Sequence, residues 1–148
     1  MVVLNPNNWH WVDKNTLPWT KAFFQDRLSD LTVVSNDSKH EIKITSVSNV
    51  SGDSNVSQRK GQPICYFDLQ LSFAVQVAEL ETEKELSSGT ISIPEFMHDE
   101  RDFEVQYQSF DSFLDLIKLE FYPRVYEILL QYQPALIEEH SKDLKHNQ

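Results

Sequence analysis

The alternation of apolar and polar side chains from Cys65 to Val77 constrains the fold more than any other feature of the sequence. The odd positions read Cys, Phe, Leu, Leu, Phe, Val and Val, whereas the even positions from Tyr66 to Gln76 read Tyr, Asp, Gln, Ser, Ala and Gln. Because successive side chains of a strand point to opposite faces, this pattern predicts one long strand with a single buried face. At ~3.3 Å per residue, such a strand extends ~43 Å.

Shorter alternating segments on both sides predict further strands. Apolar and polar residues alternate over residues 40–44 and again over residues 102–108. Residues 90–93 are expected to form a short strand that Pro94 ends. Turn-forming residues at 51–55 and an acidic connection at 79–89 are expected to separate the strands. Together these segments predict an antiparallel β-meander of about four strands.

A sheet with one apolar face needs a cover, and helical spacing supplies two candidates. Thr16 and Pro18 are typical of a helix start, and a short helix follows them. Its expected buried face comprises Trp19, Phe23, Leu28 and Leu31.

The second candidate is a long helix of roughly thirty residues, or ~45 Å, behind a cap at Asp111 or Ser109. Pro123 and Pro134 lie within its pattern and are expected to kink or split it. Its apolar positions are Phe113, Leu114, Ile117, Phe121, Val125, Ile128, Leu129, Tyr132, Leu136 and Ile137. The sequence therefore predicts an elongated α+β domain over residues 1–148, with a short N-terminal and a long C-terminal helix packed on the apolar face of the meander.

The net negative charge of the chain excludes some classes of binding partner. The chain holds 13 basic and 23 acidic side chains, a formal charge of −10, which repels nucleic-acid phosphates and anionic membranes. From Glu79 to Asp115 there are eleven acidic and two basic residues, so one end of the molecule is expected to be strongly acidic. That end is either a solvated loop or a surface that steers the chain toward a basic protein partner.

The first ten residues lack the basic and apolar regions of a signal peptide, and Cys65 is the only cysteine. These features are typical of a cytoplasmic protein in a reducing compartment.

Nothing in the sequence matches a familiar catalytic, metal or cofactor motif. HExxH, GxSxG and glycine-rich phosphate loops are missing, and Cys65 lies on the predicted buried face, where a thiol packs as an apolar group. The segment MHDERD gathers three acidic residues around His98, but a polar loop explains it better than a metal or hydrolytic site. We therefore expect a binding protein rather than an enzyme, with no cofactor and no metal.

Two segments have the composition of a binding surface. Asn5–Trp11 reads NPNNWHW, and its tryptophans either pack on the domain or face a partner. Ile64 and Tyr66 should point away from the buried face, close to the basic pair Arg59 and Lys60. An exposed apolar pair beside two cations is typical of an interface, although neighbouring cross-strand side chains could also cover it.

A third segment, PEFMHDERD, places Phe96 and Met97 in a charged loop. If the meander brings this loop beside the start of the long strand, a mixed apolar and charged patch forms there.

These segments resemble a known family. The motifs NxNNWHWxDKN at 5–15, GDxxVxQRKG at 52–61, FDL at 67–69 and HSKD near the C-terminus together are similar to the N-terminal domain of the activators of the heat-shock protein 90 ATPase. The likeness covers essentially the whole chain. Members of this family usually carry a second, C-terminal domain, and the chain ends before it, so we expect a single-domain member that is a monomer when free.

The resemblance implies a co-chaperone in the cytoplasm that has no active site of its own. It would bind the middle domain of heat-shock protein 90, with the chaperone's N-terminal domain as a further candidate contact. It would help to release the catalytic loop of the chaperone and promote the closed, ATP-hydrolysing dimer. The alternative is an independent acidic scaffold or holdase that binds unfolded clients through Phe96, Met97 and Tyr66.

Carried over position by position, the resemblance also implies site residues. The partner-binding set is Asp53, Arg59, Lys60, Ile64, Tyr66, Phe96, His98 and Asp99. The motif linked in the family to control of ATPase stimulation is Asn5, Asn7, Asn8, Trp9, His10 and Trp11. The sequence departs from the family at Gln62, where a lysine is usual, and at Tyr66 and His98, where leucine and phenylalanine are frequent. Phe96 or Met97 is the candidate replacement anchor.

Overall fold

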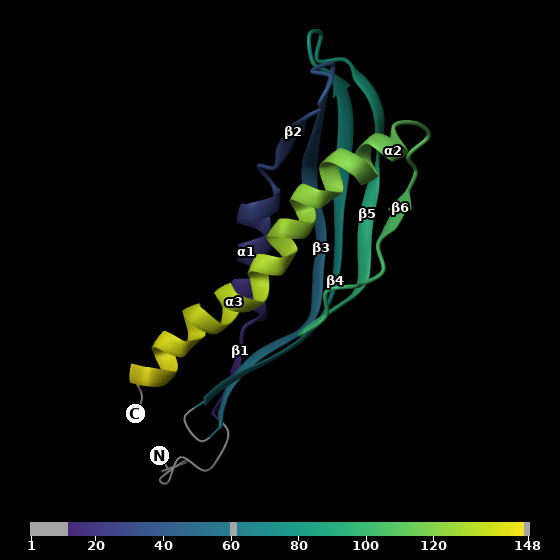
Figure 1. Cartoon of the computed structure of the whole chain (residues 1–148). Helices are drawn as coiled ribbons and strands as arrows, with labels where there is room; N and C mark the ends of the chain where they lie inside the picture. The colour runs from purple at the N-terminus through teal and green to yellow at the C-terminus, as the bar shows by residue number, and fades with distance from the viewer. Residues whose placement is uncertain (1–11, 60–61, 147–148) are drawn as a thin grey trace.

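The computed structural model describes residues 12–59 and 62–146 as an elongated antiparallel sheet with helices on one face (Figure 1). The elements are β1 (Val12–Asn15), α1 (Leu17–Leu28), β2 (Thr32–Val34), β3 (His40–Arg59), β4 (Gln62–Glu79), β5 (Glu85–Met97), β6 (Gln106–Gln108), α2 (Leu114–Leu116), the π-helical turn η1 (Ile117–Phe121) and α3 (Tyr122–His146). The predicted α+β class, with a short first helix and a long last one, is confirmed.

The strands β3, β4, β5 and β6 follow one another as the predicted antiparallel meander. Two short strands that the sequence analysis did not predict, β1 and β2, both pair with β3. The described sheet therefore has six strands rather than about four.

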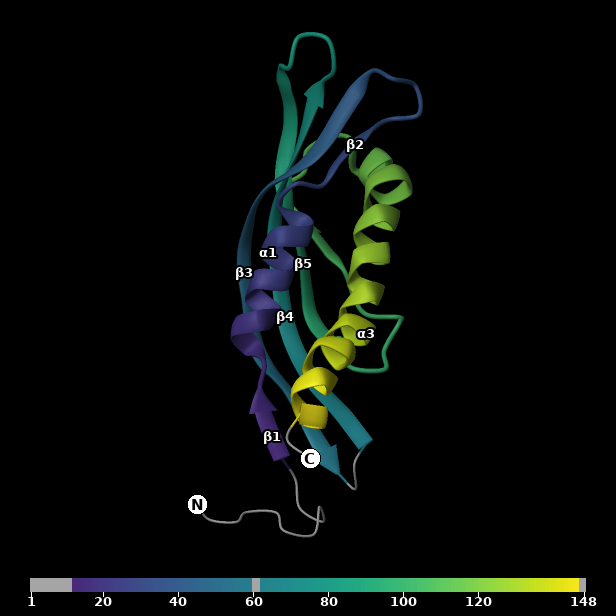
Figure 2. The same cartoon turned by 90° about the vertical axis from the view of Figure 1, so that its left-hand side faces the viewer.

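β4 behaves as its alternating pattern predicts, because its odd positions from Phe67 to Val77 are all buried. Cys65 continues this face but is only half-buried. Both α1 and α3 lie against this face, and Figure 2 shows them side by side in front of the sheet. Trp19 and Leu31 of the predicted α1 face are partly buried, whereas Phe23 and Leu28 belong to the core.

The turn predicted at residues 51–55 is wrong. β3 continues through this segment and pairs with β4 residue by residue from Ser51 to Arg59. Gly52 makes this possible, because its φ of +115° is a conformation that other residues rarely adopt and a Cβ there would lie 2.2 Å from the Asp68 carbonyl oxygen. Pairing along the whole of β4 overrides the local turn preference.

The end of the next strand was also wrongly placed. β5 starts at Glu85, so residues 87–89 belong to the strand rather than to the connection, and it runs past Pro94 to Met97. Leu69 pairs with Phe96 and Leu71 with Ile93, so two residues of β5 stand opposite one of β4. This β-bulge accommodates Pro94, which lacks the N–H that a regular ladder would use.

The long helix starts without the predicted side-chain cap. Phe113 occupies the N-cap position with a φ of +66°, and the Asp111 carboxylate instead accepts a hydrogen bond from the Ser87 hydroxyl. The predicted irregularity at Pro123 takes the form of the π-helical turn that ends two residues earlier, whereas α3 continues through Pro134.

A buried hydroxyl cluster ties the two helices to β3. The Tyr132 hydroxyl lies 2.6 Å from the Thr20 hydroxyl and 2.7 Å from the Ser54 hydroxyl, and Ser54 also contacts the Thr16 hydroxyl at 2.7 Å. Burial raises the pKa of the Tyr132 phenol, so its hydroxyl keeps its proton and can either donate or accept in these hydrogen bonds.

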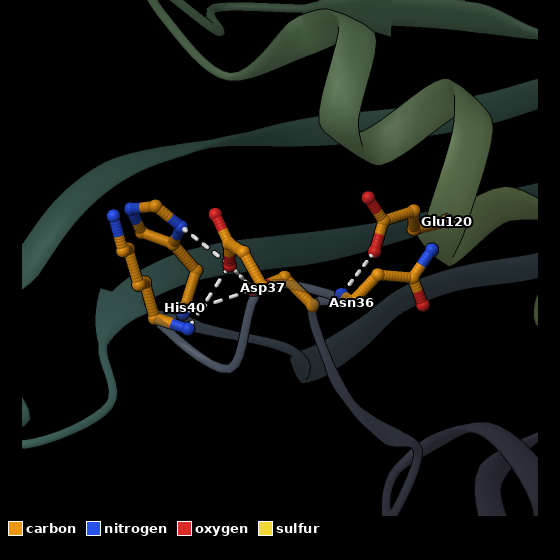
Figure 3. Close-up of polar contacts among 6 residues, drawn as sticks. Asn36, Asp37, His40 and Glu120 are labelled. Carbon is orange, nitrogen blue, oxygen red and sulfur yellow. Dashed lines mark hydrogen bonds and ion pairs between the residues drawn. The ribbon is translucent and has the colours of Figure 1, made fainter.

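The loop between β2 and β3 contacts η1 through a hydrogen bond between Asn36 and Glu120 (Figure 3). The Glu120 carboxylate accepts a 2.6 Å hydrogen bond from the backbone N–H of Asn36. Within the loop, the Asp37 carboxylate accepts hydrogen bonds from the Ser35 hydroxyl and the Lys39 N–H, which lower its pKa.

The acidic stretch from Glu79 to Asp115 does not form one end of the molecule, as the sequence analysis expected. Residues 79–85 surround the turn between β4 and β5, whereas residues 95–104 lie at the far end of β5. These ends are ~40 Å apart along a strand of this length. Among the residues that the structure describes, no helix is long and apolar enough to cross a membrane.

Candidate partner-binding surface

The outer face of β3 and β4, away from the helices, carries the predicted interface. Asp53 of β3 stands opposite Asp68 of β4, Asn55 opposite Tyr66, and Ser57 opposite Ile64. Directly opposed residues of an antiparallel pair share one face of the sheet. We call the surface formed by Asp53, Ile64, Tyr66, Asp68 and His98 the β4 patch.

Ile64 and Tyr66 are the apolar centre of the β4 patch. Their side chains are 41% and 42% exposed, as their even positions in the alternating pattern predict. Large apolar side chains with this exposure are few in the described part of the chain, and the others, Val34 and Leu119, lie on β2 and η1. The two residues therefore mark a local apolar spot on a largely polar face.

His98 brings the end of β5 to this spot. Its ring lies 5.1 Å from the Tyr66 ring, and its Nδ1 lies 3.4 Å from the Phe67 nitrogen and 3.3 Å from the Phe67 oxygen. Met97 stands opposite Asp68 in the pairing of β4 with β5. The sequence left open whether the 94–102 segment lies beside the start of β4, and the structure places it there.

Two carboxylates border the apolar spot. Asp53 is exposed, and Asp68, directly opposite, has one oxygen, Oδ1, that is buried and lacks a hydrogen-bond partner. Like charges directly opposed across two strands repel each other, which destabilises the sheet locally. A basic side chain of a partner would relieve this repulsion.

Asp99 follows His98 in a turn with a φ of +64°. Its backbone N–H donates to Gln133 Oε1 and its carboxylate accepts from Gln133 Nε2, both at 2.8 Å. Asp99 is exposed, and its position is fixed by α3 rather than by the sheet.

Phe96 corrects the predicted partner-binding set. It is only 2% exposed and packs on Phe67, with 5.2 Å between the ring centroids. The bulge at Pro94 explains this, because one extra residue in β5 moves Phe96 to the buried face that Ile93 also occupies. Its side chain is therefore part of the core and is not exposed as a surface anchor.

The structure describes the remaining predicted residues only in part or not at all. Arg59 is the last residue of β3, and only its backbone is described. Lys60 and the motif residues Asn5, Asn7, Asn8, Trp9, His10 and Trp11 lie outside the described residues.

The described residues near the β4 patch include one thiol, Cys65, and no cluster of metal ligands. Burial, followed by the charge of Asp99, raises the pKa of the Cys65 thiol, which disfavours the nucleophilic thiolate. Within residues 12–59 and 62–146, no group of three or more His, Cys, Asp and Glu side chains could hold a metal ion.

Sequence reasoning missed Asp68 and Gln133. Asp68 occupies an even, outward position of the alternating pattern, so its place opposite Asp53 could have been inferred once the β3–β4 register was known. No sequence pattern near Gln133 predicts its hydrogen bonds to Asp99, because they depend on how α3 packs beside residues 98–101.

Comparison with known proteins identifies the family of the chain. The family model described as "Activator of Hsp90 ATPase, N-terminal" matches residues 13–140. The chain belongs to this family. It is 57% identical to the Hsp90 co-chaperone HCH1 of Saccharomyces cerevisiae, over 98% of this chain and 99% of that protein.

More distant relatives agree with this assignment. The chain is 34% identical to the Hsp90 co-chaperone AHA1 of Saccharomyces cerevisiae over 98% of its own length, but it spans only 44% of that protein. The crystal structure of Aha-1 from Plasmodium falciparum superposes with a TM-score of 0.77 at 24% identity, and the match covers 91% of this chain and 93% of that one. This structural likeness supports the activator-domain fold.

Proposed function

We propose that the chain is an Hsp90 co-chaperone that binds the middle domain of the chaperone and stimulates its ATPase. The 57% identity to HCH1 over nearly the full length of both proteins is the observation that carries this proposal. The chain itself is not an enzyme in this proposal and acts as a monomer when free.

The β4 patch is the proposed contact with the middle domain. Ile64 and Tyr66 would bury their exposed area in an apolar spot of the chaperone, as anchors near the centre of an interface do. Asp53 and Asp68 would pair with a basic side chain of the partner, and Arg59 and Lys60 with acidic ones. Such a mixed surface sets the orientation of binding as well as its strength.

Stimulation follows from preferential binding to one conformer of the chaperone. The co-chaperone binds the state in which the catalytic loop is released and the dimer closes, and it thereby raises the population of that state. A tenfold preference for the active conformer favours it by ~1.4 kcal/mol without donating any catalytic group. A further contact with the N-terminal domain of Hsp90 would add to this preference.

The motif at Asn5–Trp11 has a separate proposed role in stimulation. Deleting residues 1–11 should leave affinity for the chaperone largely unchanged while the stimulated ATPase rate falls. Loss of affinity in this variant would instead place the motif in the binding surface.

A coupled ATPase assay with purified Hsp90 tests the proposal. Addition of the chain should raise the turnover of ATP, and an Ile64→Ser/Tyr66→Ser variant should raise it much less at the same concentration. Leu119→Ser is the matched control, because Leu119 is 75% exposed but lies on η1, outside the β4 patch. An unchanged ATPase rate with the wild-type chain would contradict the proposal.

The alternative is a scaffold or holdase that binds unfolded clients directly, for which exposed Tyr66 is the main support. The burial of Phe96 removes one of the three residues that this alternative used. Suppression of aggregation of a model client in the absence of Hsp90, lost in Tyr66→Ser, would favour it.

A further inference from the structure

We propose that Gln133 of α3 is a positioning residue that holds and presents the His98–Asp99 turn to the partner. This inference rests on the proposed function and extends it to a residue on the opposite layer of the fold. It follows from the geometry of the turn, from the chemistry of the Gln133 amide and from the space that surrounds the turn.

The turn needs an external support. Asp99 has a φ of +64°, a region that residues other than glycine adopt infrequently and that aspartate tolerates better than most. Such a conformation persists where its surroundings fix it. Within the backbone the turn is held by the long hydrogen bonds from His98 N–H to the Phe67 oxygen and from Glu100 N–H to the Met97 oxygen, at 3.2 Å and 3.3 Å.

Gln133 supplies this support with both ends of its amide. Its oxygen accepts from the Asp99 N–H and its nitrogen donates to the Asp99 carboxylate, each at 2.8 Å. A side chain must hold a donor and an acceptor together to do this, which a primary amide does and a carboxylate or an ammonium group does not. Gln133 therefore fixes both the backbone and the side-chain direction of Asp99.

The turn does not pack tightly on the helix. A cavity of about 370 Å³ lies between the turn and α3, lined by residues that include Phe67, Glu100, Leu130 and Ile137. Among the described side chains of α3, two form hydrogen bonds with residues 98–101. Gln133 bonds to Asp99, and the Tyr126 hydroxyl donates to the Arg101 carbonyl oxygen at 2.9 Å. Without Gln133, Asp99 has room to leave its present position.

Loss of this support would affect the β4 patch, because the ring of His98, which is adjacent to Asp99, contacts Tyr66. The same turn therefore sets where the Asp99 carboxylate projects and how His98 lies on the β4 patch. Loss of Gln133 should weaken partner binding even though its side chain lies outside the patch.

The test compares two variants with a matched control on the same helix. Gln133→Ala removes the clamp, and Gln133→Glu keeps the shape but removes the donor and adds a negative charge facing Asp99. Gln131→Glu adds the same charge two positions away, where Gln131 accepts a 3.1 Å hydrogen bond from Arg27. Thermal unfolding checks that all three variants fold.

The first readout is amide hydrogen exchange of the free protein, measured by NMR. In Gln133→Ala the Asp99 amide loses its acceptor and should exchange about tenfold faster, equivalent to ~1.4 kcal/mol, whereas in Gln131→Glu it should be unchanged. Unchanged exchange in Gln133→Ala would overturn the inference whether or not the chain binds Hsp90.

The second readout is calorimetric affinity for the isolated Hsp90 middle domain. Both Gln133 variants should bind about tenfold more weakly than the wild type, with Gln131→Glu at wild-type affinity, and a Gln133→Ala/Asp99→Ala double variant should bind no more weakly than Asp99→Ala alone. Asp99→Asn keeps the acceptor for Gln133 and should retain slow exchange while losing the charge. Faster exchange with wild-type affinity would overturn the presenting role, and failure of the wild-type chain to bind would overturn the proposed function instead.

Discussion

At the scale of single residues, the opposed carboxylates of Asp53 and Asp68 lower the stability of the free protein. The two carboxylates stand opposite each other on adjacent strands, and Oδ1 of Asp68 has no hydrogen-bond partner. Opposed like charges destabilise a sheet, and opposite charges stabilise it. A pair of acidic residues that lowers the stability of the sheet is explained better by binding to a basic partner than by folding.

This pair predicts opposite effects of one substitution on stability and on binding. Asp53→Lys would form a cross-strand ion pair with Asp68, so urea unfolding should show a gain of about 0.2–1 kcal/mol. Binding to Hsp90 should weaken at least tenfold, because the lysine repels a basic partner residue. A variant that is both less stable and fully active in binding would contradict this account.

The Tyr132 hydroxyl predicts a loss of stability. In Tyr132→Phe the Thr20 and Ser54 hydroxyls lose a shared buried partner, which should lower the free energy of unfolding by about 1–3 kcal/mol. Tyr126→Phe, which removes a hydroxyl bonded at an exposed site, is the control and should cost less. If both variants lose the same free energy of unfolding in urea, the buried cluster stabilises the fold no more than the exposed hydrogen bond does.

The raised pKa of Tyr132 predicts a pH dependence of stability. Because the folded pKa lies above the ordinary value of 10.0, the unfolded chain releases the phenolic proton first as the pH rises. Stability from this group is therefore complete below pH 10 and is lost above it. Tyr132→Phe should flatten the fall in the midpoint of thermal unfolding above pH 10, and an identical fall would contradict this.

At the scale of elements, the strands show which parts of the fold can be predicted from local patterns. β4 and its outward residues Ile64 and Tyr66 follow from strict alternation, and both are exposed as predicted. The turn at 51–55 and the strand end at Pro94 were wrong, because long-range pairing with β4 overrides local preferences. Phe96 was wrong for the same reason, since a bulge that no local pattern reveals changes the face on which it lies.

Gly52 shows what this continuity of β3 requires. Gly52→Ala would place a Cβ 2.2 Å from the Asp68 carbonyl oxygen at a φ of +115°, so β3 would have to move away from β4. We expect a loss of several kcal/mol in the free energy of unfolding, at the upper end of single substitutions. Circular dichroism during urea unfolding measures it, and a change below about 0.5 kcal/mol would mean that the strand bends elsewhere.

At the scale of the whole molecule, the core and the proposed binding surface lie on opposite faces of the sheet. The helices lie on one face of the sheet and cover its buried side chains, which form the core (Figure 2). The opposite face, near the start of β4, holds Ile64, Tyr66 and the two carboxylates. The acidic residues gather at both ends of β5 rather than at one. Only the end that includes Asp99 adjoins the β4 patch, so only that part is expected to guide a partner to it.

Calorimetric titration of the chain into the isolated middle domain of Hsp90 tests the central claim most directly. The account predicts saturable binding by the wild-type chain, at least tenfold weaker binding by Ile64→Ser/Tyr66→Ser, and wild-type binding by Leu119→Ser. Binding that survives in the double variant, or no binding by the wild-type chain, would contradict the assignment of the β4 patch as the surface that meets the chaperone.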